Sequence, residues 1–235
     1  MQKGLCIKEI KQYGVLVFMP LIYSALIVPF AWYFLEVYIF GNAAAAAIGA
    51  VILSFVAAAI LQTIIIRDVR NKMWGYFVCS TSAGHKGYLL TKYCFVLACA
   101  LFNLVGTAAA CTIYAGLTST SDVISLRFTC KLALILFSVQ IFLRAIDIPI
   151  TVRFGEKKGS IVKLISFIAV IICCTVLVII IPEAGSVFTS LKNTLTTSST
   201  KAWFLPTLAG ISTAAYVLSY FISCRVYIKS LENVE

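Results

Sequence analysis

Residues 43–66 read AAAAAIGAVILSFVAAAILQTIII, and no charged side chain interrupts them. The hydrocarbon core of a bilayer is about 30 Å thick, and a helix rising about 1.5 Å per residue crosses it in roughly 20 residues. This run is long enough to do so. Its many Ala residues are small, and small residues let membrane helices approach closely. The stretch therefore predicts a membrane-spanning helix that packs against other helices.

Five further apolar stretches have a similar length, and 61% of the 235 residues are hydrophobic. The expected spans are 14–35, 43–66, 94–116, 128–148, 162–182 and 205–226. Each is expected to be helical, because backbone polar groups find no water inside lipid. The strand-like alternation of an outer-membrane barrel is absent. The sequence predicts an all-α polytopic membrane protein with six spans, a single transmembrane domain over residues 1–235.

Basic residues fix the expected orientation. Fifteen of the 19 Lys and Arg residues fall before the first span, around the loops after spans two and four, or after span six. The other side holds only Arg127, Lys131, Lys192 and Lys201. Because short loops rich in Lys and Arg stay in the cytoplasm, both termini are expected there. The net charge of +10 is then a topology signal, and nucleic-acid binding is not expected.

The N-terminal segment 2–12 is short and amphipathic. Leu5, Ile7 and Ile10 alternate with Lys3, Lys8, Glu9 and Lys11. We expect an interfacial helix in the headgroup layer, its lysines near anionic lipid. A simple topology anchor is a compatible interpretation.

Few amide or charged side chains lie within the spans. Besides Lys131, Lys163 and Arg225 at the span ends, they are Gln62, Asn103, Gln140, Arg144 and Asp147. Arg144 and Asp147 are one helical turn apart near the cytoplasmic end, so we expect them to pair and snorkel. The three amides would suit a mostly apolar translocation path with sparse polar contacts, or equally helix–helix contacts.

Catalytic and metal chemistry are not expected. The nine cysteines form no CxxC pattern, and one His cannot complete a Cys/His zinc site, so we interpret the cysteines as reduced packing residues. A nucleophile–base pair or carboxylate cluster, which an intramembrane enzyme needs, is also missing. The sequence therefore predicts no catalytic residues and no metal ligands.

The loop at residues 67–93 reads RDVRNKMWGYFVCSTSAGHKGYLLTKY. Val69, Met73 and Phe77 recur every four residues, and Trp74 lies beside them, which predicts an amphipathic helix at the cytoplasmic surface. Residues 80–84 would break this helix before span three. The helix could rest on lipid or dock a cytosolic partner.

The loop at residues 149–160 reads PITVRFGEKKGS. Pro149 is expected to end or kink span four. Gly155 and Gly159 bracket Glu156, Lys157 and Lys158 in a short exposed element. The loop lacks the spacing of a phosphate-binding P-loop, so no ATPase site is expected in the chain.

These segments resemble those of a known family. Three sets of residues are similar to motifs of the small six-span permeases of type-2 ABC exporters, a family that includes exporters of phenol-soluble-modulin-like peptides. The sets are Lys3-Gly4-Leu5-Cys6-Ile7-Lys8-Glu9; Asp68, Trp74, Ser80, Lys86 and Lys92-Tyr93; and Phe154-Gly155-Glu156-Lys157-Lys158-Gly159. The chain departs from the pattern at Phe77, Ser82 and His85, where Tyr, Pro and Arg are usual.

The resemblance implies a permease in a bacterial plasma membrane that pairs with a second permease, identical or paralogous. It implies that coupling helices dock a cytosolic ABC ATPase. The residues concerned would be Val69, Met73, Trp74, Phe77, Phe154, Gly155, Glu156, Lys157, Lys158 and Gly159. ATP and Mg²⁺ would bind that partner, and the exported substrate would be an amphipathic peptide or toxin. A non-transporting scaffold or sensor module and an intramembrane enzyme remain the alternatives.

Overall fold

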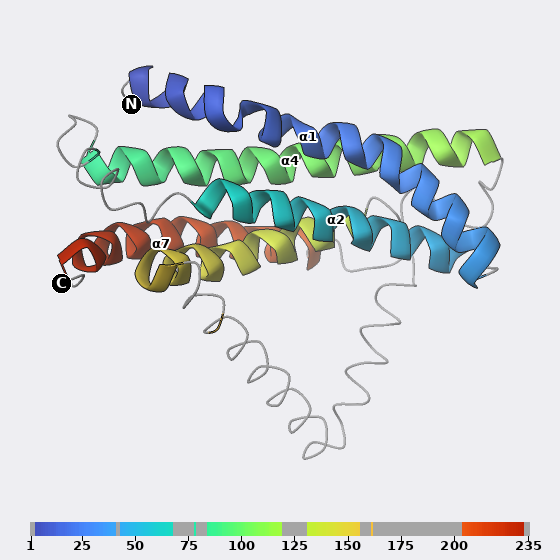
Figure 1. Cartoon of the computed structure of the whole chain (residues 1–235). Coiled ribbons are helices and arrows are strands. Elements are labelled where there is room, and N and C mark those ends of the chain that lie inside the picture. Colours follow the sequence, from blue (N-terminus) through green and yellow to red (C-terminus); the bar gives the residue numbers. More distant parts are fainter. Residues whose placement is uncertain are drawn as a thin grey trace, which may run out of the picture.

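The computed structural model of the chain describes residues 3–40, 43–67, 78, 84–118, 131–155, 161 and 204–232. These segments are helical, and none of them contains a strand. The elements are α1 (Lys3–Leu35), the short π-helix η1 (Glu36–Phe40), α2 (Ala43–Arg67), α4 (Gly84–Thr118), the helix Lys131–Gly155, called helix 131–155 below, and α7 (Phe204–Glu232) (Figure 1).

Within the described residues, five helices are long and apolar enough to cross a membrane. They correspond to five of the six expected spans, and the remaining one, 162–182, lies outside the described residues. The α2 helix matches its expected bounds closely. The α4 helix begins at Gly84, at the end of the break expected over residues 80–84 and ten residues before the expected span 94–116, and Tyr88 and Leu89 in its first turns are fully buried.

The segment expected to form an N-terminal interfacial helix is, from Lys3 on, the first part of α1, which runs to Leu35 as one helix. Its place in the headgroup layer stays a prediction. No proline interrupts the chain before Pro20, so the helical hydrogen bonds continue past the expected boundary. Tyr13 and Val17 then anchor this part of the helix in the core. Lys8 and Lys11 remain exposed on the first turns.

Pro149 was expected to end or kink the helix; helix 131–155 continues past it to Gly155, and a kink at Pro149 stays a prediction. A proline removes one main-chain donor, but neighbouring groups still hold the helix together: the Thr151 Oγ1 donates a 2.9 Å hydrogen bond to the Asp147 carbonyl. Val152 is buried in the core. The helix ends at Gly155, whose φ of 75° is the left-handed conformation that commonly closes a helix.

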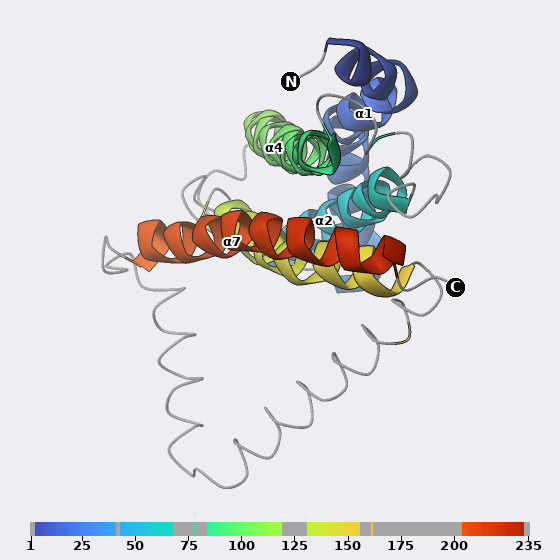
Figure 2. The same ribbon diagram turned by 90° about the vertical axis from the view of Figure 1, so that its left-hand side faces the viewer.

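The helices α1, α2 and α4 all contact one another, and α7 packs against α4. Helix 131–155 lies alongside α7 in both ribbon views (Figures 1 and 2). A larger core cluster includes Tyr13, Ile65, Tyr93, Ile148 and Tyr216, one from each of the five helices. A second cluster surrounds Trp32 and contains fully buried alanines of α2. The small residues of α2 therefore pack against protein, as the sequence predicted.

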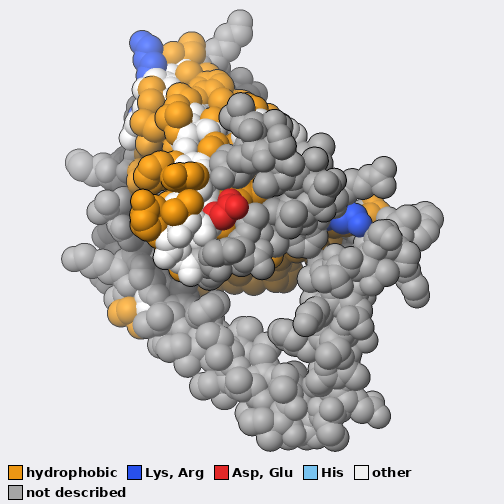
Figure 3. Space-filling view, turned by 90° about the vertical axis from the view of Figure 1, so that its right-hand side faces the viewer, with side chains coloured by type: hydrophobic (Ala, Val, Ile, Leu, Met, Phe, Trp, Pro, Cys, Tyr) orange, Lys and Arg blue, Asp and Glu red, His pale blue; other side chains and the backbone are white. Residues whose placement is uncertain are grey.

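The start of α1 and the end of α7 lie toward the same end of the bundle, which we call the basic end (Figure 1). Its exposed cations in the described segments are Lys8, Lys11, Lys86, Arg153 and Arg225. The view of the opposite end shows mainly hydrophobic side chains among the residues that are coloured (Figure 3). This distribution follows the charge pattern of the sequence. That the basic end faces the cytoplasm stays a prediction.

Candidate functional site

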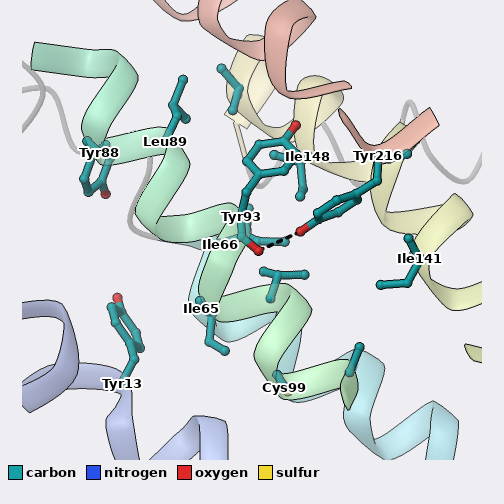
Figure 4. Packing of buried hydrophobic residues seen from close by; sticks show 14 of the residues in the cluster. Tyr13, Ile65, Ile66, Tyr88, Leu89, Tyr93, Cys99, Ile141, Ile148 and Tyr216 are labelled. Carbon is teal, nitrogen blue, oxygen red and sulfur yellow. Dashed lines mark hydrogen bonds between the residues drawn. The ribbon is translucent and has the colours of Figure 1, made fainter. Parts of the chain in front are cut away.

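Among the described residues, three polar clusters join the helices of the apolar bundle, and the first holds α7 to α4. The Tyr93 hydroxyl lies 2.8 Å from both the Ser219 and the Ser223 hydroxyls. The Tyr216 hydroxyl donates a 2.8 Å hydrogen bond to the main-chain carbonyl of Tyr93 (Figure 4). We call these four residues the Tyr93 cluster. Because all four side chains are buried, the hydroxyls bond to each other rather than to water.

Lys92, next to Tyr93, lies between α4 and α1. Its side chain is 1% exposed, and its Nζ lies 4.0 Å from the centre of the Tyr13 ring. The Tyr88 ring centre is 5.5 Å away. An ammonium over aromatic rings is attracted by their negative faces. The Lys92-Tyr93 pair quoted in the family resemblance thus connects α4 to α1 through one residue and to α7 through the next.

The second cluster joins α2 to helix 131–155 and consists of Gln62, Gln140, Arg144 and Asp147. The Arg144 Nε donates a 2.8 Å hydrogen bond to the Gln62 Oε1, and the Gln140 Nε2 donates one of 3.1 Å to the same atom. The two other guanidinium nitrogens of Arg144 donate to the Ala59 carbonyl of α2 and to the Asp147 carboxylate. We call this the Arg144 cluster.

The expected pairing of Arg144 with Asp147 is confirmed, but the expected snorkelling is not. Arg144 is only 7% exposed. Its guanidinium turns across to α2 because Gln62 and the Ala59 carbonyl supply buried acceptors there. A charge in an apolar setting is retained where it is fully hydrogen-bonded. The sequence does not show that α2 and helix 131–155 are neighbours, so it could not predict the contact of Arg144 with α2.

The third cluster lies where α1, α2 and α4 meet. The Asn103 Oδ1 accepts hydrogen bonds from the hydroxyls of Ser54, at 3.0 Å, and Tyr23, at 3.1 Å. The Ser54 hydroxyl also lies 2.9 Å from that of Thr107, and the Tyr23 hydroxyl donates a 2.5 Å hydrogen bond to the Ser54 carbonyl. We call Tyr23, Ser54, Asn103 and Thr107 the Asn103 cluster. It ties three helices into one unit.

The three amides assigned to a translocation path fall into two of these clusters. Gln62 and Gln140 meet in the Arg144 cluster, and Asn103 lies in the Asn103 cluster. Gln62 and Asn103 are fully buried, and Gln140 is 6% exposed. The Gln62 Nε2 also donates a 3.2 Å hydrogen bond to the Val96 carbonyl of α4. In this conformation the amides make helix–helix contacts, and their role in a path stays a prediction.

Most of the residues expected to dock an ATPase lie outside the described residues. These are Val69, Met73, Trp74, Phe77, Glu156, Lys157, Lys158 and Gly159. Phe154 and Gly155 end helix 131–155, and the Arg153 guanidinium lies 5.2 Å from the centre of the Phe154 ring. Val78, one residue beyond Phe77, is helical and fully buried in the larger core cluster.

The sequence reasoning missed the hydroxyl side chains. It singled out amides and charges, whereas Ser54, Thr107, Ser219 and Ser223 form much of the interhelical network. The available signal was the recurrence of Ser at positions 212, 219 and 223 along one apolar segment. Within the described segments, no three His, Cys, Asp or Glu side chains come together as metal ligands would.

Comparison with known proteins gives one family. The sequence model of a family described as "ABC-2 family transporter protein" matches residues 7–228. Neither the curated proteins nor the solved structures contain a match. The matched region covers nearly the whole chain and includes the five candidate membrane spans of the described residues, Ile10 to Tyr227. The chain therefore belongs to the ABC-2 transporter family, as a multi-pass membrane protein and the permease component of an ABC transporter.

Proposed function

We propose that this permease exports amphipathic peptides from a bacterial cell, driven by a separate ATPase subunit docked at its basic end. The observation that carries the proposal is the family match over residues 7–228, because ABC-2 permeases work with a partner ATPase. The chain is not itself an enzyme in this proposal. ATP and Mg²⁺ bind the partner, and a second permease completes the membrane part.

The docking surface is formed by residues 69–77 together with Phe154–Gly159. Support comes from the place where helix 131–155 ends. Gly155 closes the helix with a left-handed turn, and Phe154 and Gly155 are the first two residues of the proposed docking segment. The exposed side chain of Arg153 precedes the turn, and Val78 anchors the chain after Phe77 in the core. A rigid anchor on each docking segment would transmit force from the ATPase to the helices.

The substrate class follows from the chemistry of the helices. At their helix contacts, the described spans hold the ion pair Arg144–Asp147 and the Lys92 ammonium over the Tyr13 ring, and otherwise neutral polar groups. A small ion would need a charged or carbonyl-lined path. A peptide with one apolar face could instead move along apolar helices and meet only the sparse amides Gln62, Asn103 and Gln140 without leaving many polar groups unpaired. The resemblance to peptide exporters points the same way.

The docking role is tested with Trp74→Ala in the complex of permease and ATPase. An aromatic anchor at an interface is commonly worth about 2 kcal/mol or more, so affinity for the ATPase should fall by roughly 30-fold. Phe30→Ala is the matched control, since this aromatic side chain is 70% exposed on α1. Phe30→Ala should leave binding unchanged. Equal binding of wild type and Trp74→Ala would contradict the proposed docking surface.

The substrate is tested in proteoliposomes that contain the permease and its ATPase. Amphipathic helical peptides should stimulate ATP hydrolysis and accumulate across the membrane. Peptides of the same composition with scrambled order, which lack an apolar face, are the control and should do neither. Stimulation by a lipid or a sugar-linked compound instead would show that the peptide assignment is wrong. A permease that binds no ATPase at all would favour a scaffold or sensor function.

A further inference from the structure

We propose that α2 and helix 131–155 separate during the transport cycle, and that the Arg144 cluster is the gate that holds them together in the closed state. The inference rests on the proposed function, since it takes the ATPase to act on Phe154–Gly159. Two features of the structure carry it: the way the Arg144 cluster is divided between the two helices, and the contrast with the Asn103 cluster.

Each half of the Arg144 cluster keeps a partner of its own when the helices part. Asp147 lies on the same helix as Arg144, so the ion pair moves with the guanidinium. Gln62 keeps its hydrogen bond to the Val96 carbonyl, which belongs to α4 and therefore stays with α2. Opening thus leaves no isolated charge in the apolar interior, which would be the prohibitive step.

Helix 131–155 also contains a replacement acceptor. The Gln140 Oε1 is buried and has no hydrogen-bond partner among the described residues. Gln140 lies four positions before Arg144, so both side chains share one face of the helix. When Gln62 moves away, the Gln140 Oε1 can accept the hydrogen bond that the Arg144 Nε gave to the Gln62 Oε1. The Arg144 Nε therefore has an acceptor in both states: the Gln62 Oε1 when the helices are together and the Gln140 Oε1 when they are apart.

The helices on the other side of the gate are held by a second polar cluster and by a close backbone contact. The Asn103 cluster links α1, α2 and α4 through five side-chain and main-chain groups. Gly106 of α4 lies so close to α1 that an added Cβ would be 3.0 Å from the Leu21 carbonyl oxygen. These three helices form one body. The contact that can yield is the one between α2 and helix 131–155.

The gate also connects directly to the proposed docking surface. Phe154 and Arg144 lie on the same helix, about 15 Å apart at about 1.5 Å per residue. Helix 131–155 is continuous from Arg144 through Pro149 to Phe154, and Ile148 and Val152 pack in the core, so a displacement of Phe154–Gly159 by the ATPase would reach Arg144 along this helix. Breaking the three hydrogen bonds to α2, two from Arg144 and one from Gln140, would then open a passage between the helices.

The first test bridges the gate covalently in the complex with ATPase, in a chain whose nine native cysteines are replaced. Gln62→Cys and Gln140→Cys are joined by a short bifunctional methanethiosulfonate reagent, because the two native side chains touch at 3.1 Å. We expect bridging to lower ATP-driven transport at least tenfold, and a reductant to restore it. Because the same variant is compared bridged and unbridged, effects of the substitutions themselves cancel.

The matched control is a disulfide inside the three-helix body. Ser54→Cys and Thr107→Cys place thiols where hydroxyls lie 2.9 Å apart between α2 and α4. This bond should form and leave transport within about twofold of its reduced form. Loss of transport in both bridged pairs would contradict the proposed gate, because it would show that the α2–α4 contact must move as much as the contact between α2 and helix 131–155. Full transport with the gate bridged would overturn it as well.

A second measurement needs no substitution. Hydrogen–deuterium exchange is compared between the nucleotide-free and the ATP-trapped wild-type complex. Amides in 58–66 and 138–148 should exchange at least fivefold faster in one state, while those in 20–28 and 100–108 should not change. Unchanged exchange on both sides of the gate would overturn the inference. If the chain does not copurify with an ATPase, the proposed function is refuted. Copurification is checked before either test, so this failure is distinguished from a failure of the gate.

Discussion

Gly106 of α4 lies directly against Ser24 of α1. A Cβ built on Gly106 would fall 2.0 Å from the Ser24 Oγ, and 3.1 Å from the Leu21 Cα. The Ser24 hydroxyl has a place to bond on its own helix, since it donates a 3.2 Å hydrogen bond to the Leu21 carbonyl. Close backbone approach at a glycine is what lets α1, α2 and α4 share one polar cluster.

Gly106→Ala is therefore expected to destabilise the protein by about 1–3 kcal/mol, the usual effect of overpacking a tight contact. The Ser24 side chain could rotate away, but the backbone of α1 at Leu21 could not. Thermal unfolding in detergent micelles measures the effect. Gly210→Ala in α7 is the control, because nothing lies within 4 Å of its added Cβ. That variant should be neutral or gain up to about 1 kcal/mol from helix propensity.

Tyr93→Phe should loosen α7 from the rest of the bundle. The substitution removes the hydroxyl that meets Ser219 and Ser223 but keeps the ring among Tyr216 and Tyr220. Interhelical hydrogen bonds in membrane proteins average about 0.6 kcal/mol, with a maximum near 1.7 kcal/mol. We expect a loss of about 1 kcal/mol and faster proteolysis near α7. Ser219→Ala should cost less, since Ser223 remains, and adding it to Tyr93→Phe should cost almost nothing further.

Arg144→Met should be among the most destabilising substitutions in the described helices. It leaves the carboxylate of Asp147 without its ion-pair partner in a largely buried position, at an expected cost of about 3–5 kcal/mol. The double variant Arg144→Met/Asp147→Asn should recover much of this loss, because no charge is then left behind. Denaturation of the purified variants gives the comparison. A double variant less stable than the single one would refute the pairing.

The orientation of the chain is tested by cysteine labelling in intact cells. Cysteines at Asn71 and Lys158, in the two basic loops, should not react with an impermeant external maleimide. A cysteine at Lys192, in the loop expected outside, should react and serves as the positive control. All three positions lie outside the described residues, so the prediction rests on the distribution of Lys and Arg. External labelling of the cysteine that replaces Asn71 would show that the orientation is the reverse of the one predicted.

The sequence by itself determined the helical membrane architecture. Apolar length is a local property, so the bounds of α2 and the presence of five spans could be predicted directly from residues. Boundaries at prolines and at the chain start were less predictable. Whether Pro149 ends a helix depends on the packing of Val152 and on the bond from Thr151, which the local sequence does not encode.

Only the tertiary structure decided which polar residues meet. Gln62 and Arg144 are 82 positions apart, and nothing in either segment indicates that α2 and helix 131–155 are neighbours. Gly106 and Gly210 look alike in sequence, each four residues before an Ala, yet one abuts α1 and the other faces open space. Contacts between helices depend on their relative rotation and distance. Those are set by the packing of the whole bundle rather than by any one segment.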